Sequence, residues 1–346
     1  MLLYTEHKQK EGIIMSKIKV AINGFGRIGR LVLRAALESG RKDIEFVAVN
    51  DLAPAEQNAY LLQYDSVHGK LPMDVKLEGD TIIVGNHKIK CISEKDPTKL
   101  PWKKMGIDVV MECTGIFTAA DKARVHIDAG AKRVLVSAPS AGADKTIVFG
   151  VNEKTLTKND IIVSNASCTT NCLAPVVAVL DKKFGIESGW MTTVHAYTGD
   201  QQLLDKNHKD FRRARAACLS MIPTSTGAAK AIGLVLPKLA GKLDGIAIRV
   251  PTPDVSVVEL VVNLEKSATV EKVNAAMRAN VSETFGYNEL PLVSIDFTHD
   301  AHSSIFDATQ TRVLDDKLLH VTAWYDNEWG FSNRMSDTAV AMGKLI

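Results

Sequence analysis

A cysteine at the start of an apolar run is the most reactive group that the sequence offers. Cys168 stands in the polar stretch Ser164 to Cys172, just before the apolar run Leu173 to Leu180, and such a change of character marks a helix N-terminus. Free N–H groups and the helix dipole at that position lower a thiol pKa from about 8.5, which favours the nucleophilic thiolate. Pro175 leaves two alternatives: a distorted first turn, or a regular helix that begins nearer Cys172. Cys168 is a candidate nucleophile in both.

A histidine that could act as its base lies in a predicted strand, Met191 to Tyr197. His195 is the candidate, although a strand histidine is more often a half-buried structural residue and the sequence shows no partner for it. Cys172 is expected to be a small buried apolar residue. A zinc site made of Cys168, Cys172 and His195 would lack a fourth ligand, so the sequence predicts no metal site.

A glycine pattern near the N-terminus predicts a dinucleotide site. Gly24, Gly26 and Gly29 match G-x-G-x-x-G between a predicted strand and a predicted helix, and Asp51 ends the next strand 22 residues later. Such glycines permit a tight turn beside a pyrophosphate, and the acid binds a ribose hydroxyl. A carboxylate there repels a 2′-phosphate, which favours NAD over NADP. The alternative is an ordinary strand-to-helix turn in which Asp51 caps a helix.

Other segments could bind anions. The hydroxyl-rich turn Pro223 to Lys230 enters a predicted helix, and that segment alone fits a capped helix start as well as a phosphate site. Arg249 is a lone cation in the apolar run Ile246 to Val250, where either a protein carboxylate or a substrate phosphate would satisfy it. Phe211 to Arg215 is expected to be a solvated or interface face, because no basic domain surrounds it.

The elements that must position these groups form two patterns. Up to about Gly150, apolar strands alternate with helices, which predicts a doubly wound, mostly parallel α/β sheet. From Trp190 onward the strands are longer, which predicts an α+β unit with a largely antiparallel sheet. The expected elements are strands at 18–22, 44–50, 108–112, 133–137, 190–197, 245–250, 255–264 and 318–325, helices at 27–39 and 332–346, and an antiparallel insertion at 76–92.

Composition excludes several classes of protein. The 346 residues suffice for about two domains, and 46% hydrophobic with 24% charged residues is typical of a globular chain. A net charge of +2 argues against nucleic acid or a membrane surface as partner. No apolar run is long enough to span a membrane. Five cysteines without framework spacing favour a reducing, cytoplasmic setting. Residues 1–14, which precede a second methionine at Met15, are expected to be a disordered extension.

The motifs, taken in order, resemble those of the phosphorylating glyceraldehyde-3-phosphate dehydrogenases, from about Lys17 to the C-terminus. They are the glycine turn, Ser164 to Cys172, Val194 to Tyr197, Pro223 to Lys230, Arg249 to Val257 and Trp324 to Gly330. The resemblance implies that Cys168 attacks the aldehyde, that His195 is its base, and that inorganic phosphate cleaves the resulting thioester. It further implies a homotetramer, an NAD-binding Rossmann domain over 15–167 on which a final helix at 333–346 packs, and a catalytic domain over 168–332.

The resemblance also implies roles for particular residues. By this resemblance, Thr198 and Arg249 bind the phosphate of the substrate. The incoming phosphate is bound by Ser167, Thr169, Thr226 and Gly227. The cofactor is bound by Gly24, Gly26, Arg27, Ile28, Gly29, Asp51, Lys95, Ser137 and Asn327. Lys95 replaces the arginine usual in the family, which makes a backbone contact the safer expectation there. Lys206 and Asn207 stand where NAD-preferring relatives often have Leu-Pro, so dual use of NAD and NADP stays open.

Three other functions remain as alternatives. A dehydrogenase of the same architecture could act on erythrose 4-phosphate, which is one carbon longer. A cysteine hydrolase using Cys168 and His195 would not need the glycine turn or Asp51. A noncatalytic, nucleotide-dependent scaffold would have an unreactive thiol at Cys168.

Overall fold

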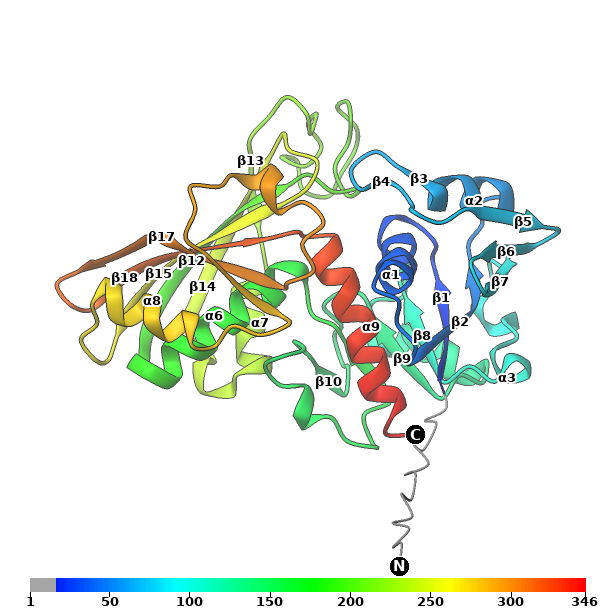
Figure 1. Cartoon of the computed structure of the whole chain (residues 1–346), viewed down its shortest axis with the longest axis horizontal. Helices are drawn as coiled ribbons and strands as arrows, with labels where there is room; N and C mark the ends of the chain where they lie inside the picture. The colour runs from blue at the N-terminus through cyan, green and yellow to red at the C-terminus, as the bar shows by residue number, and fades with distance from the viewer. Residues whose placement is uncertain (1–16) are drawn as a thin grey trace, which may run out of the picture.

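Two β-sheets dominate the chain and lie side by side, with a long C-terminal helix between them (Figure 1). The computed structural model describes residues 17–346. The extension expected at residues 1–14 lies outside the described residues. No helix in the described part of the chain is long and apolar enough to cross a membrane.

The first sheet has nine strands in the order β10-β11-β9-β8-β1-β2-β7-β6-β5. Its central strands are nearly continuous apolar runs because helices cover both faces of a parallel sheet. The strands from β10 to β7 are parallel, and β5 to β7 form the antiparallel insertion that the sequence predicts. The bounds are β1 Ile18–Asn23, β2 Ile44–Asn50, β5 Val75–Glu78, β6 Thr81–Val84, β7 His87–Ile92, β8 Val109–Glu112, β9 Arg133–Val136, β10 Lys145–Thr146 and β11 Ile162–Ser164.

Helices and a small hairpin surround this sheet. The helices are α1 Arg27–Glu38, α2 Ala55–Gln63, α3 Trp102–Met105, α4 Ala120–Ala123 and α5 Val125–Asp128, with 3₁₀ turns η1 Pro97–Lys99 and η2 Glu153–Thr155. The hairpin pairs β3 Tyr64–Asp65 with β4 Gly69–Lys70. It lies at the edge of the domain that faces the second sheet (Figure 1).

The second sheet has seven strands in the order β13-β14-β12-β15-β18-β17-β16. It is largely antiparallel, as predicted, with parallel pairing only of β12 with β14 and of β16 with β17 in the described chain. Strand β15 alternates buried and exposed side chains, because helices pack on one face of the sheet. The bounds are β12 Ile186–Ala196, β13 Ile222–Ser225, β14 Leu243–Val250, β15 Ser256–Leu264, β16 Phe285–Asn288, β17 Ser304–Leu314, β18 Leu318–Tyr325, α6 Cys168–Phe184, α7 Ala228–Val235, η3 Pro237–Leu239, α8 Val270–Arg278 and η4 Ser294–Phe297.

Helix α6 settles the question that Pro175 raised. The helix begins at Cys168 and continues through Pro175 to Phe184. Proline has no N–H to donate to the carbonyl of Asn171, yet the helix tolerates that loss. Burial of this segment against the second sheet compensates for the missing hydrogen bond. The alternative of a regular helix starting near Cys172 is therefore wrong.

The C-terminal helix α9 spans Trp329–Gly343, so it starts three residues before the predicted range. It packs against α1 and against β1, β8 and β9 of the first sheet. Met335 and Ala339 bury their side chains completely in that contact. The domain limits at 15, 167 and 332 stay a prediction.

We predict that Gly29→Ala destabilises the fold. A Cβ at Gly29 would lie 2.1 Å from the carbonyl oxygen of Gly24, so α1 would have to move away from the turn that follows β1. Overpacking of this kind costs about 1–3 kcal/mol, measurable as a lower urea midpoint. Gly199→Ala, where the Cβ meets open space, is the matched control. An unchanged midpoint for Gly29→Ala would contradict the prediction.

Candidate active site and cofactor cavity

A tight turn between the two sheets places Cys168. Ala166 adopts a φ of 58°, which is unusual for a residue with a side chain, and its N–H donates to Ser164 Oγ at 3.0 Å. The Ser167 hydroxyl then accepts the N–H of Thr170 at 3.1 Å and caps α6. The turn directs the helix N-terminus toward the second sheet, with Cys168 as its first residue.

Cys168 meets His195 at the junction of two hydrophobic cores. Its Sγ lies 3.4 Å from Nε2 of His195, which stands near the end of β12. The side chain of Cys168 contacts both the core of the first sheet and that of the second. His195 Nδ1 lies 2.7 Å from the carbonyl oxygen of Ala196, which only accepts, and 3.1 Å from Nη1 of Arg249, which only donates. The shorter contact favours a proton on Nδ1, which leaves the Nε2 lone pair facing the thiol. The fold thus supplies the partner that the sequence could not show.

Burial determines the protonation states of Cys168 and His195 before a substrate binds. His195 is 3% exposed, and burial together with the positive charge of Arg249 lowers its pKa to about 3, so the imidazole is neutral. Burial also raises the pKa of the Cys168 thiol, against the opposing effects of Arg249 and of the hydrogen bonds from Thr169. The expectation of a lowered thiol pKa is therefore wrong for this structure, because loss of solvation outweighs the helix terminus. A thiol and a neutral imidazole face each other.

Arg249 brings a positive charge beside the pair without a carboxylate partner. It lies on β14, next to β12, and its Nη1 donates to the carbonyl of Ala196 at 3.1 Å and to Thr198 Oγ1 at 3.4 Å. Its Nε is buried and has no hydrogen-bond partner among residues 17–346. Of the two partners that the sequence left open for Arg249, a protein carboxylate is therefore absent from the described residues. A buried donor without a partner favours an anionic ligand.

Tyr325 is a site residue that the sequence analysis missed. Its hydroxyl lies 2.9 Å from Thr169 Oγ1 and 2.9 Å from Thr193 Oγ1, and its ring packs edge-on against His195. This packing restricts rotation of the imidazole ring. The Thr169 hydroxyl is occupied by that hydrogen bond, so Thr169 can offer an incoming anion its backbone N–H more readily than its side chain. Tyr325 ends strand β18 within the motif Trp324 to Gly330, but nothing in that motif indicated that its side chain would reach His195.

The remaining predicted phosphate residues lie at helix starts. Thr226 Oγ1 accepts the N–H of Ala228, and Gly227 is the N-cap of α7, which packs beside α6. Neither residue is hydrogen-bonded to Cys168 or His195 in the described chain. Cys172 is fully buried in the core, as predicted.

The glycine turn forms one wall of a cavity of about 490 Å³. Gly24 has a φ of 90°, and a Cβ there would lie 2.6 Å from the backbone nitrogen of Thr114. At Gly26, by contrast, a Cβ would meet nothing within 4 Å, so the backbone is open to an approaching ligand. Gly26 is also the N-cap of α1, whose free N–H groups attract phosphate. These features of the turn are those of a dinucleotide-binding site.

Asp51 and Lys95 line the same cavity, as does Asn50. The Asp51 carboxylate accepts the N–H groups of Phe25 at 2.8 Å and Ala53 at 2.9 Å, which hold it at the carboxyl end of β2.

The other predicted cofactor residues do not line that cavity: Arg27, Ile28, Gly29, Ser137 and Asn327. The Arg27 side chain turns away to Asp65 and Glu328, and Asn327 is buried with its Oδ1 accepting from Ser256. Lys206 and Asn207 are exposed and do not border the cavity either.

Comparison with known proteins agrees with this arrangement. Residues 18–120 match the family model "Glyceraldehyde 3-phosphate dehydrogenase, NAD binding domain", and residues 167–327 match the corresponding C-terminal domain. Glyceraldehyde-3-phosphate dehydrogenases of Xanthobacter flavus and Cereibacter sphaeroides are 61% and 60% identical to the chain, and that of Zymomonas mobilis is 56% identical. Each alignment covers 95% of this chain and 99% of the relative. The chain belongs to the glyceraldehyde-3-phosphate dehydrogenase family.

Proposed function

We propose that the chain oxidises D-glyceraldehyde 3-phosphate with NAD and inorganic phosphate to 1,3-bisphosphoglycerate, a step shared by glycolysis and gluconeogenesis. The observation that carries this proposal is the contact of Cys168 Sγ with the unprotonated Nε2 of His195, beside an arginine with a free donor. A dinucleotide cavity in the same chain argues against a simple cysteine hydrolase, which would not need it.

The first step is formation of a thiolate. His195 Nε2 accepts the Sγ proton as the sulfur attacks the aldehyde carbon, and it then donates that proton to the aldehyde oxygen, which becomes the hydroxyl of a thiohemiacetal. A neutral imidazole is the required form, and burial beside Arg249 maintains it. The Ala196 carbonyl holds the proton on Nδ1, so Nε2 is the atom that receives the new one.

The second step converts the thiohemiacetal into a thioester. Bound NAD supplies the oxidant, a nicotinamide ring that accepts the hydride. His195 takes the hydroxyl proton as the carbonyl re-forms. An oxygen of inorganic phosphate then attacks the acyl carbon, the C–S bond breaks, and His195 returns its proton to Sγ, which restores the starting thiol and neutral imidazole. Covalent capture keeps the oxidation energy in the thioester and divides one difficult step into two.

Arg249 and Thr198 are proposed to bind the phosphate that the substrate already carries. The free Nε of Arg249 and the nearby Thr198 hydroxyl support this assignment. The incoming phosphate is assigned to Ser167, Thr169, Thr226 and Gly227, which lie at the starts of α6 and α7 where N–H groups are free. The cofactor is assigned to the residues of the glycine turn, Asp51, Lys95, Ser137 and Asn327.

We predict that Cys168→Ser loses NADH formation from glyceraldehyde 3-phosphate, NAD and phosphate, measured as absorbance of NADH. Removal of a covalent nucleophile should lower kcat by at least about 10³-fold. Cys218→Ser, an exposed cysteine, is the matched control and should keep full activity.

Two substrate controls separate the alternative functions. Omission of phosphate should stop turnover by the parent protein, and glyceraldehyde 3-phosphate should give a higher kcat/KM than erythrose 4-phosphate. Turnover that does not depend on phosphate, or that survives in Cys168→Ser, would refute the proposal.

We predict that Arg249→Leu slows alkylation of Cys168 by iodoacetamide. The positive charge of Arg249 stabilises the thiolate, so its removal raises the pKa of Cys168 further. Below that pKa, the thiolate fraction falls about tenfold for each unit of increase. The pH profile of the alkylation rate should move to higher pH in Arg249→Leu and stay in place in Arg312→Leu, which carries its charge at the far end of β17. A shift to lower pH would contradict the assignment.

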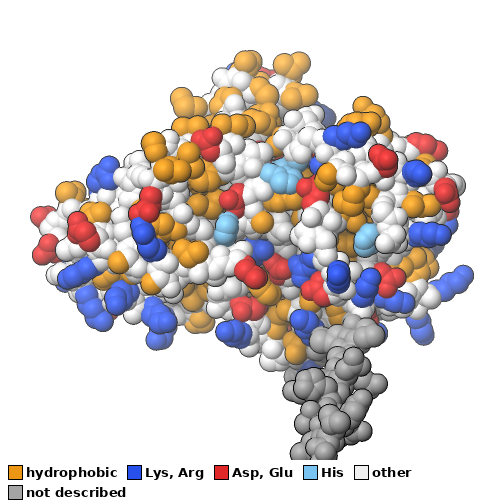
Figure 2. Space-filling model, in the orientation of Figure 1, with side chains coloured by type: hydrophobic (Ala, Val, Ile, Leu, Met, Phe, Trp, Pro, Cys, Tyr) orange, Lys and Arg blue, Asp and Glu red, His pale blue; other side chains and the backbone are white. Residues whose placement is uncertain are grey.

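We further propose that the chain assembles as a homotetramer through the segment 197–221. Hydrophobic side chains gather at the top of the molecule, where this segment lies (Figures 1 and 2). Leu203, Leu204, Phe211, Leu219 and Met221 are each at least 75% exposed in the single chain. Contiguous exposed apolar groups of this kind mark association surfaces.

Substitution of Phe211 and Leu204 by aspartate should lower the mass measured by light scattering from four chains toward a smaller species. The introduced charges would have to be buried without partners in the assembly. Leu314→Asp, an exposed apolar residue at the end of β17, is the control that should keep the parent mass. A parent protein that is already a monomer would refute this proposal.

A cytoplasmic location is the third proposal. All five cysteines are free thiols, and the reactive one is required in its reduced form. A reducing compartment keeps thiols in that form.

A further inference from the structure

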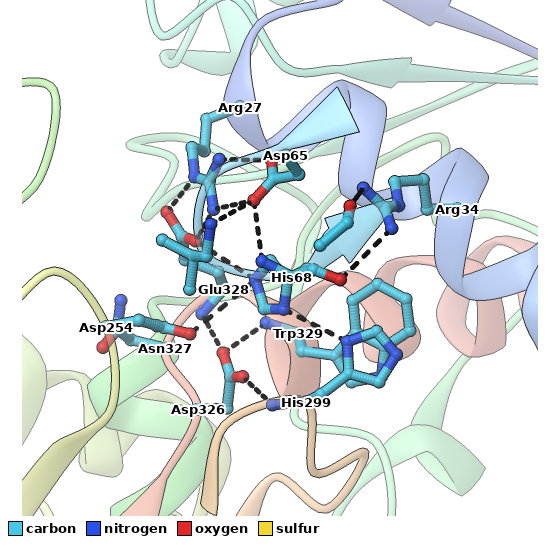
Figure 3. Close-up of polar contacts among 12 residues, drawn as sticks. Arg27, Arg34, Asp65, His68, Asp254, His299, Asp326, Asn327, Glu328 and Trp329 are labelled. Atoms are coloured by element: carbon cyan, nitrogen blue, oxygen red, sulfur yellow. Dashed lines mark hydrogen bonds and ion pairs between the residues drawn. The ribbon is translucent and has the colours of Figure 1, made fainter. Parts of the chain in front are cut away.

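A cluster of histidine and carboxylate groups lies between the two domains, apart from Cys168 (Figure 3). His68 comes from the β3–β4 hairpin, Asp254 from the connection between β14 and β15, and Glu328 from the start of α9. One ligand atom from each of the three residues lies within 4.8 Å of the other two. The cluster therefore joins the first domain to the second.

The distances suit a tetrahedral metal ion. His68 Nε2 lies 3.3 Å from Glu328 Oε2 and 3.7 Å from Asp254 Oδ2. A zinc ion with ligands at about 2.0–2.2 Å separates neighbouring ligand atoms by roughly 3.3–3.6 Å. The three atoms lie near the positions that such an ion would require, with a fourth position for water.

The hydrogen bonds of His68 and His299 require one positive charge more than two neutral imidazoles provide. Glu38 accepts from His299 Nε2 at 2.9 Å, and the Nδ1 atoms of His299 and His68 lie 3.1 Å apart. The row of contacts from Glu38 through His299 and His68 to Glu328 needs three protons, and two neutral imidazoles carry only two. A third proton, or a cation beside His68 Nε2, completes the row.

Asp254 gives a second, independent reason to expect a positive charge in this cluster. Its side chain is only 4% exposed, and neither carboxylate oxygen has a hydrogen-bond partner among residues 17–346. A buried carboxyl group without a partner is costly in its charged form, so it calls for either a proton or a cation. Arg27 does not provide it, because its guanidinium is engaged by Glu328 and Asp65.

The surroundings meet the other requirements of a metal site. Glu328 is held by two hydrogen bonds from Arg27, at 2.6 and 2.5 Å, and His68 is oriented by His299, so two ligands have partners that fix their direction. A cavity of about 430 Å³ is lined by Asp254 and Glu328 and gives an ion access to the cluster.

We propose that His68, Asp254 and Glu328 bind one divalent transition-metal ion of the zinc class, with water as fourth ligand, and that this ion links the two domains. The ion is structural in this role, since the reaction proposed for Cys168 does not involve it. Its ligands come from three distant segments, which is why the sequence motifs predict no metal site.

The test measures metal uptake in a Cys168→Ala background, which removes the reactive thiol as a competing ligand. Zn²⁺ is titrated near neutral pH by calorimetry, and Co²⁺ is titrated by its visible absorption, whose intensity reports tetrahedral geometry. We expect one ion per chain, a tetrahedral cobalt spectrum, and a Tm that rises with Zn²⁺ concentration because only the folded chain holds the three ligands together.

Three variants identify the ligands and their support. His68→Asn and Asp254→Asn should each abolish the cobalt spectrum and the Zn²⁺-dependent rise in Tm. His299→Phe keeps a ring stacked on Trp329 but removes the hydrogen bond to His68, and it should weaken binding about 10- to 100-fold. His302→Asn is the matched control, because His302 pairs with a single carboxylate, Asp300, and it should bind as the parent does.

Two outcomes would overturn the proposal. The parent chain could take up no metal while folding normally, which would mean that a proton within the cluster supplies the missing charge. Alternatively, His68→Asn and Asp254→Asn could bind Zn²⁺ as tightly as the control, which would place the ion elsewhere.

Discussion

The turn from Ser164 to Ser167 is the constraint on which the active site depends. It connects β11, the last interior strand of the first sheet, to α6, the first helix of the second domain. The Asn165 side chain accepts from Thr338 of α9, and its carbonyl accepts from Asn171 of α6, so three elements converge on it. A change in this turn would move Cys168 relative both to the cofactor cavity and to His195.

One positive charge shapes the chemistry of the pair. Arg249 lowers the pKa of His195 and also lowers that of Cys168, while burial pushes the two in opposite directions. The outcome is a neutral pair in which the proton moves only when the sulfur attacks. The same guanidinium has a free donor, so in the proposed assignment the substrate phosphate and the thiolate share a single cation. In that assignment, the cation that binds the substrate also stabilises the thiolate that attacks it.

Buried charged side chains also lie at the junction of the two domains. Carboxylates from both domains meet there, and Arg27 neutralises only part of their charge. Arg27 begins α1, the helix that follows the glycine turn, and its side chain reaches away from the cavity toward Glu328 at the start of α9. The junction and the cofactor turn therefore share one residue, which ties the stability of the interface to the position of the turn.

The sequence by itself determined what short-range sterics and periodicity encode. The glycine turn and strand β2 from Ile44 to Asn50 could be predicted, because each depends on neighbours in the chain. A helix start in the stretch from Cys168 to Cys172 could be predicted too, but Pro175 left its first residue open. Only the tertiary structure decided which distant groups meet. Cys168 and His195 are 27 positions apart, and His68 and Glu328 are 260 positions apart, so their contact depends on how two sheets pack. Burial is likewise a property of that packing, and it reversed the expected shift of the Cys168 pKa and left Asp254 without a partner in the described chain.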